Sequence, residues 1–195
     1  MNRSSRSEPL FTATREYVTF IRVLRRALTR HGVELLSYCV MPNHWHLVVH
    51  IPQIQELSRF MHWLSTTHAR RWHRARGTVG LGPVYKSRFV SVPIGPESDL
   101  IRVCRYVERN PLRAGLVTRA EAWPWSSLAD RTRKRRRLLL LSAPFLESQI
   151  WTDYVNQAQT MAEVVAMDRI AGRLEVAGRT RPVTSVPHLL KPVEN

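Results

Sequence analysis

Apolar and polar positions alternate with two different periods along the first part of the chain. Over Thr14–His31 apolar side chains recur every three or four residues, which predicts a helix that Gly32 would end. The apolar segment Val33–Val40 predicts a strand, and the turn-forming residues Met41–Asn43 follow it. A returning strand is predicted over His44–Ile51. These two strands together form a β-hairpin.

The same reading places three more elements in the middle of the chain. A helical period over Leu57–Arg74 gives one apolar face and one basic face. After a glycine-bearing loop, the β-branched and aromatic content of Val84–Val92 predicts a strand. A third helix is then expected, capped by Ser98 or Asp99 and ended or bent by Pro111, which lacks a backbone donor.

The order helix, hairpin, helix, strand, helix predicts an α+β fold: a ferredoxin-like antiparallel sheet with helices on one face. Such a sheet needs a strand before the first helix, but the first nine residues are mostly polar. We therefore expect the N-terminal strand to be missing or truncated, as in a chain whose true start lies upstream or in a decaying gene copy. The predicted organisation is one domain over residues 1–128 and, over residues 129–195, a basic linker with a helical or disordered extension.

The charge of the chain points to a polyanionic partner. There are 30 Lys and Arg residues against 15 Asp and Glu, a formal net charge of +15, and arginine pairs well with phosphate. A nucleic acid is the expected partner, although a membrane surface would attract the same charge. The run Arg131–Arg137 is either a solvated segment or a nucleic-acid contact.

Two classes of protein are disfavoured. No apolar run approaches the roughly 18 residues that span a bilayer, and no signal peptide is evident, so a cytoplasmic location without membrane attachment is expected. Cys39 and Cys104 lie in apolar segments without metal-binding or redox spacing. We expect both to be small buried hydrophobic residues.

The candidate chemistry begins with His44 and His46. On a strand, residues two apart point to the same face, so these imidazoles would lie ~7 Å apart at their Cα atoms and could share one metal ion. Trp45 between them would point to the opposite face and pack in the core.

Tyr106 and Asn110 supply the second half of the constellation. They are four residues apart on the predicted third helix and so share one face. A metal held by the imidazoles and the Asn110 amide oxygen would act as a Lewis acid on a phosphodiester, and the Tyr106 hydroxyl would attack it. Taken alone, Tyr106 is equally typical of a packed aromatic residue, and Asn110 of a helix stop.

Several motifs of the chain, in order, resemble the REP-associated tyrosine transposases, a branch of the single-tyrosine HUH transposases related to the transposase of insertion sequence 200. The resemblance runs from about Leu10 to Ser127. It rests on the segments Tyr38–Val49, Leu57–Leu64, Val84–Phe89, Arg105–Val117 and Trp123–Ser127.

The resemblance implies a DNA transposase that nicks and joins single-stranded or hairpin DNA. His44 and His46 would be its metal ligands together with Asn110, and the implied metal is Mg²⁺ or Mn²⁺. Tyr106 would be the catalytic nucleophile that forms a 5′-phosphotyrosine link and frees a 3′-hydroxyl. Two imidazoles by themselves would suit zinc or nickel better than magnesium.

The implied partner is palindromic hairpin DNA, bound by a monomer or a homodimer. The expected phosphate contacts are Arg70, Arg71, Arg74, Lys86, Arg88 and Arg113. Two alternatives stay open: a noncatalytic nucleic-acid-binding relic of a transposase, and a metal-dependent hydrolase of small phosphodiesters. The scarcity of carboxylates near the histidines argues against the hydrolase.

Overall fold

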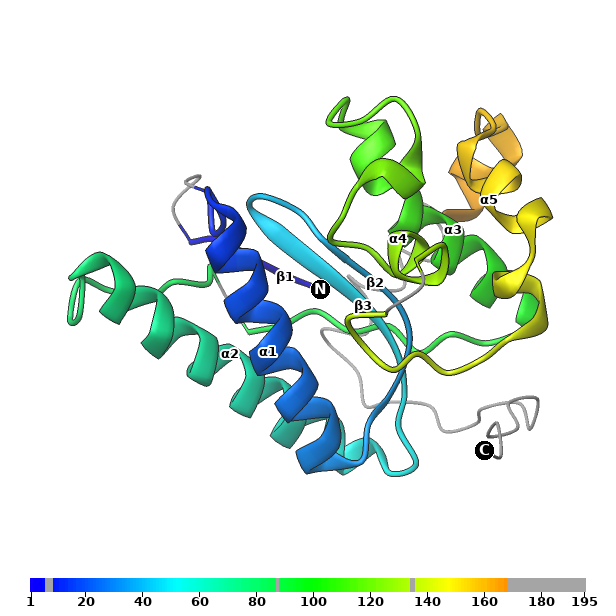
Figure 1. Cartoon of the computed structure of the whole chain (residues 1–195). Helices are drawn as coiled ribbons and strands as arrows, with labels where there is room; N and C mark the ends of the chain where they lie inside the picture. The colour runs from blue at the N-terminus through cyan, green and yellow to red at the C-terminus, as the bar shows by residue number, and fades with distance from the viewer. Residues whose placement is uncertain (6–8, 87, 134–135, 168–195) are drawn as a thin grey trace.

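The computed structural model describes residues 1–5, 9–86, 88–133 and 136–167. Three antiparallel strands form a sheet in the order β1-β3-β2, and helices surround it (Figure 1). The elements are β1 Asn2–Arg3, α1 Thr14–His31, β2 Glu34–Val40, β3 His44–His50, α2 Ile54–Arg76, α3 Glu97–Arg113, η1 Ala120–Ala122, α4 Ser127–Arg131, η2 Pro144–Glu147 and α5 Gln149–Asn156. The predicted α+β class is confirmed.

Helix α1 has the predicted bounds. Ala13 is the capping residue, and the Glu16 carboxylate accepts hydrogen bonds from the backbone N–H groups of Thr12 and Ala13 at 2.6 and 3.3 Å. Gly32 ends the helix with a φ of 58°, a conformation that glycine adopts without strain.

The hairpin is confirmed and forms the centre of the sheet. Val40 lies opposite Trp45, and the Met41 N–H donates to the His44 carbonyl oxygen at 2.8 Å across the turn. Strand β1 pairs with the other edge of β3, with Arg3 opposite His44. The expected N-terminal strand is therefore present over two residues, which agrees with the prediction of a truncated strand.

Helices cover both faces of the sheet, whereas the sequence led us to expect them on one face. Helices α1 and α2 pack on one face against Leu35, Tyr38 and Trp45, and we call this cluster the α1–α2 core. Helices α3 and α5 pack on the other against Cys39 and Val48, which belong to what we call the α3 core. Figure 1 shows the strands between the two helical layers. The reason is that both sets of alternating residues in β2 are buried.

The predicted strand over Val84–Val92 is not formed among its described residues. One isolated bridge joins Tyr85 to Ser4, backbone hydrogen bonds join Lys86 to Arg3 and Ser5 to Val84, and Val90 and Met1 exchange two hydrogen bonds. The segment lies along the N-terminal residues. A regular ladder needs a longer partner than β1.

Helix α3 continues past the point where Pro111 was expected to end it. Pro111 lies in the last turn, where it cannot donate the hydrogen bond to the Val107 carbonyl oxygen, and the helix nevertheless runs two residues further, to Arg113. Tyr106, Asn110 and Arg113 therefore follow one another at helical spacings of four and three residues, and they share one face.

The described residues after 128 pack on both faces of the sheet. Leu138 and Leu140 join the α1–α2 core, while Trp151 and Val155 of α5 join the α3 core. The pattern over Trp151–Ile170 predicts one amphipathic helix or two, and the described residues form two, α5 and residues 161–167. The last three residues of that range lie outside the described part, as does the segment 178–195, which was expected to be unstructured. The division at residue 128 stays a prediction.

Cys39 and Cys104 are buried free thiols in the α3 core, as expected. Burial raises the pKa of both thiols. Within the described ranges, no helix is long and apolar enough to cross a membrane.

Candidate metal and tyrosine site

The two histidines of β3 lie together on the face of the sheet that α3 covers. Their ring centroids are 4.9 Å apart with perpendicular planes. The Asn43 side-chain oxygen lies 2.7 Å from His44 Nδ1, which orients that ring. His46 Nε2 is buried and has no hydrogen-bond partner among the residues that the structure describes. A buried nitrogen without a partner is costly unless a ligand completes its environment.

Burial and nearby positive charge keep both imidazoles uncharged. Burial, together with the charges of Arg3 and Arg113, lowers the pKa of His44 to about 4. Burial also lowers the pKa of His46 well below its usual value, together with the charge of His44. Neutral imidazoles have the free lone pairs that metal coordination requires.

Trp45 points away from this site, as expected. It is fully buried in the α1–α2 core, and its indole N–H donates to the Tyr85 hydroxyl at 3.2 Å. The same hydroxyl lies 2.6 Å from Nδ1 of the buried His68. Trp45 therefore packs and does not stack on bases.

Helix α3 brings Tyr106 to His46 within the same chain. The two rings meet edge to face with centroids 5.7 Å apart. Asn110 is buried one turn later, and its amide N–H donates to the Tyr106 backbone carbonyl at 3.0 Å. The structure thus brings Tyr106 against His46, which adjoins His44, and places Asn110 one turn further along the same helix.

Arg113 joins this group, although it was expected only as a phosphate contact. Its Nη2 donates to the Tyr106 hydroxyl at 3.1 Å and to the Asn110 side-chain oxygen at 3.3 Å. The guanidinium carbon also lies 4.9 Å from the centre of the Tyr106 ring. A cation so placed stabilises negative charge on the phenol oxygen.

The donors present are compatible with one divalent cation. Among the described residues, no group of three or more His, Cys, Asp or Glu side chains is placed to hold a metal. The site offers instead two imidazoles and the Asn110 amide oxygen, with the unpartnered His46 Nε2 as the clearest open position. Nitrogen-rich ligand sets favour transition metals, while Mg²⁺ prefers oxygen, so Mg²⁺ or Mn²⁺ stays a prediction.

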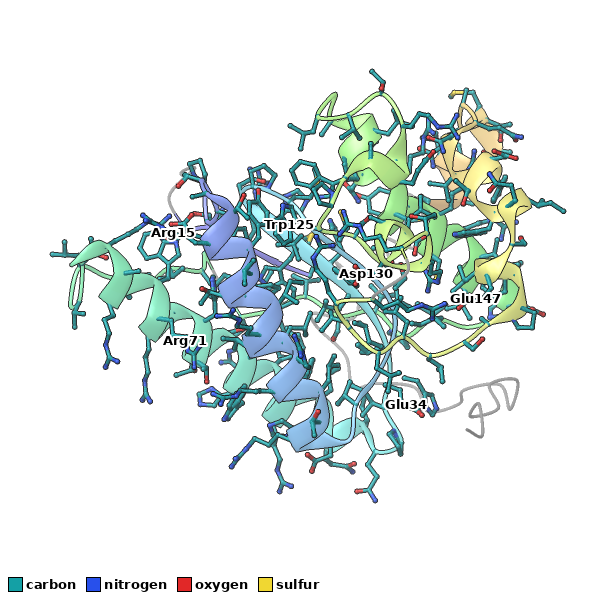
Figure 2. All side chains as sticks on the ribbon, viewed as in Figure 1. Arg15, Glu34, Arg71, Trp125, Asp130 and Glu147 are labelled. Atoms are coloured by element: carbon teal, nitrogen blue, oxygen red, sulfur yellow. The ribbon has the colours of Figure 1, made fainter. Side chains whose placement is uncertain are left out.

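A separate basic surface lies on the outer side of helices α1 and α2. A hollow of about 340 Å³ is lined by Arg22, Arg25, Arg26 and Arg71. Figure 2 shows Arg71 beside α1, and the expected contacts Arg70 and Arg74 are exposed on the same helix α2. We call the four lining arginines the α1–α2 basic surface. It lies across the sheet from the histidines, because α1 and α2 cover the opposite face.

The remaining predicted contacts, Lys86 and Arg88, are exposed on the segment that runs along β1. Sequence reasoning missed the three arginines of α1. Their spacing of three and four residues on the polar side of the predicted helix was the available signal.

The run Arg131–Arg137 has structural contacts in its described part. Arg131 pairs with the buried Glu108, and Arg137 pairs with the buried Asp130 at 3.1 Å. Asp130 is a buried residue of α4 and is labelled in Figure 2. Arg131 and Arg137 therefore stabilise the fold through these ion pairs. For these two residues, the prediction of a solvated segment or a nucleic-acid contact is wrong.

Comparison with known proteins decides the family. Residues 3–110 match the family model described as Transposase IS200 like. The chain belongs to the IS200-like transposase family. The match includes the histidines, the tyrosine and Asn110.

Two relatives of this IS200-like transposase are informative. A Haemophilus influenzae protein named as a REP-associated tyrosine transposase is 23% identical over 128 residues, which cover 58% of this chain and 72% of the relative. The solved structure of a REP-associated tyrosine transposase bound to a REP hairpin superposes with a TM-score of 0.54 at 21% identity. It covers 68% of this chain and 76% of the other, which shows that the two share a fold.

Proposed function

We propose that this transposase nicks and joins single-stranded or hairpin DNA through a covalent 5′-phosphotyrosine intermediate. The observation that carries the proposal is the contact between the Tyr106 and His46 rings within one chain, with Arg113 on the phenol oxygen. A nucleophile, a pair of neutral imidazoles and a cation thus meet on one face of the sheet. The solved neighbour's hairpin DNA supports the choice of substrate.

In the nicking step the phenol oxygen of Tyr106 attacks a phosphorus atom of the DNA backbone. A new O–P bond forms, the bond from phosphorus to the 3′-oxygen breaks, and that oxygen leaves as a 3′-hydroxyl after taking a proton. Arg113 orients the Tyr106 oxygen and stabilises negative charge on it. In joining, a 3′-hydroxyl attacks the phosphotyrosine, so no ATP is consumed.

His44, His46 and Asn110 would hold a divalent cation, Mg²⁺ or Mn²⁺. When bound, it supplies Lewis-acid polarisation of the scissile phosphate. Asn43 orients His44 for this role through the 2.7 Å contact with Nδ1. Arg113 donates to the Asn110 side-chain oxygen in this structure, and it is placed to donate to a DNA phosphate instead when DNA binds.

The α1–α2 basic surface and Arg70, Arg74, Lys86 and Arg88 would hold the DNA backbone. The four lining arginines have no carboxylate partner in the described structure, and gathering such charges is favourable only beside an anion. The location of this surface across the sheet from Tyr106 suits a DNA long enough to reach both.

The test is covalent trapping of the full chain with a pool of 3′-labelled hairpin oligonucleotides that carry single-stranded flanks, in Mg²⁺ or Mn²⁺. We expect a labelled protein adduct that Tyr106→Phe abolishes. Tyr17→Phe is the matched control, because Tyr17 stacks on Trp125 in the other core and should leave the adduct unchanged.

An adduct that persists in Tyr106→Phe, or the lack of any adduct in the parent chain, contradicts the proposal. Hairpin binding that weakens steeply with salt, without any adduct, would instead identify a noncatalytic nucleic-acid-binding relic.

A further inference from the structure

The side of helix α3 that faces away from Tyr106 carries a buried carboxylate that the proposed chemistry does not use. Glu108 is fully buried, and two residues along a helix place it almost opposite Tyr106. Its Oε1 accepts hydrogen bonds from Ser37 of β2 at 3.1 Å and from Ser127 of α4, and it pairs with Arg131. Its Oε2 accepts from the Trp151 indole N–H of α5 at 2.7 Å.

Four side chains from three segments far apart in the sequence, β2, α4 and α5, therefore meet at this carboxylate of α3. We call Glu108 and these four partners the Glu108 hub. The partners come from β2 and from the chain after α3, so the hub joins the tyrosine helix to both.

A second set of contacts holds the same helix from outside. Arg105, which is 2% exposed, donates to the backbone carbonyl oxygens of Tyr154 and Gln157 at 2.9 Å and pairs with Glu163. Arg109 donates to the carbonyl oxygen of Val155 at 2.6 Å. Both arginines thus bond backbone in or next to α5.

We infer that the Glu108 hub is a positioning device for catalysis: it holds α3 at the angle at which Tyr106 and Asn110 face the histidine pair. Apolar contacts between α3 and the sheet allow the helix to slide or rotate, because dispersion is weakly directional. Hydrogen bonds and a buried ion pair have narrow geometry and fix its rotation. Displacement of a nucleophile by about 1 Å lowers rates as much as 10²-fold.

This inference rests on the proposed function only for its kinetic part. The geometric part, that the hub sets the position of the Tyr106 ring against His46, stands without any activity. Both parts are tested below.

The test compares Trp151→Phe with Trp72→Phe in the full chain. Trp151→Phe removes one donor from Glu108 and keeps most of the aromatic volume. Trp72→Phe is the matched control, since it removes a similar indole donor, to the Leu10 carbonyl oxygen at 3.0 Å, in the other helical layer. Glu108→Gln is the stronger variant, which keeps the size of the side chain and removes its charge.

The first readout is kinetic. Trp151→Phe should lower kcat for adduct formation about 10-fold, and Glu108→Gln about 100-fold, with hairpin Kd within about twofold of the parent. Trp72→Phe should leave kcat unchanged. A purely structural role would lower the melting temperature of both tryptophan variants and leave kcat of both unchanged.

The second readout is independent of activity. 3-Fluorotyrosine placed at position 106 gives one ¹⁹F resonance, whose dependence on the His46 ring is calibrated with His46→Ala. We expect Trp151→Phe to move or broaden this resonance and Trp72→Phe to leave it unchanged.

An unchanged ¹⁹F resonance together with unchanged kcat in Trp151→Phe overturns the inference, even if Glu108→Gln fails to fold. A parent chain without nicking activity refutes the proposed function alone, because the ¹⁹F comparison still decides whether the hub positions Tyr106.

Discussion

The two faces of the sheet are built on different principles, although they share the same strands. The α1–α2 core is filled by aromatic and aliphatic side chains such as Phe20 and Leu64, both fully buried. Its buried polar contacts include the short chain from Trp45 through Tyr85 to His68. The face under α3 combines apolar residues with the charged Glu108 hub and the candidate catalytic residues.

Apolar burial and directional polar contacts contribute differently: the first mainly stabilises the folded state, and the second fixes the relative positions of the elements. Burial of apolar area is non-directional and stabilises a range of similar arrangements. A buried carboxylate with four partners stabilises one arrangement and penalises the others. Directional contacts also occur on the other face, where Tyr38 donates to the buried Asp130, which pairs with Arg137. On the α3 face they meet at the helix that carries the candidate nucleophile.

The largest expected effect on stability comes from breaking the buried ion pair. Arg131→Ala leaves the Glu108 carboxylate buried without its cation, which should lower the free energy of unfolding by about 3–5 kcal/mol. Urea denaturation measures this. The exposed Arg26→Ala is the control and should change it by less than about 0.5 kcal/mol. A loss below about 1 kcal/mol in Arg131→Ala would show that the two faces do not differ as described.

A smaller effect is expected from the polar chain of the other face. Tyr85→Phe removes the hydroxyl that serves both Trp45 and His68, and should cost about 1–3 kcal/mol in unfolding free energy. At temperatures at which Tyr85→Phe is still folded, its kcat for adduct formation should equal that of the parent chain. If kcat fell as it does in Glu108→Gln, positioning would not be confined to the α3 side.

The smallest effect on stability, and a clear one on binding, is expected at the α1–α2 basic surface. Arg22→Ala combined with Arg25→Ala should leave urea unfolding unchanged and reduce the slope of log K against log[salt] for hairpin DNA by about 2. Fluorescence anisotropy over a salt series measures the slope. Arg30→Ala with Arg59→Ala removes the same charge from other positions on the two helices, and an equal change there would exclude a specific role.

Local patterns were enough to predict α1, the hairpin and α2. Their apolar periods agree with the layers that they join, and Gly32 ends α1 as expected. The prediction of a strand over Val84–Val92 was wrong. A strand needs a partner strand to pair with, and this segment has only the short N-terminal segment beside it. The prediction of helices on one face was wrong, because β2 buries both of its faces, including the polar Ser37, and does not show the simple alternation of a one-sided strand.

The part of the candidate site that could be predicted is the part in which residue spacing within one strand or one helix places two side chains on the same face. His44 and His46 share a face of a strand, and Tyr106 and Asn110 share a face of a helix. Arg113 was assigned to phosphate because nothing in its local pattern shows a bond to the Tyr106 hydroxyl. The role of Glu108 depends on partners 19 to 71 residues away, which no local period encodes.

The sequence by itself determined the periods of the main helices and the hairpin, the spacing of the metal and tyrosine candidates, and the excess of positive charge. These follow from repeats of two and 3.6 residues and from the ionisation of single side chains. Only the tertiary structure decided that α3 lies on the histidine face and that Glu108 joins three distant segments, β2, α4 and α5. Such contacts arise when elements separated along the chain pack together, and their partners are chosen by three-dimensional fit rather than by sequence distance.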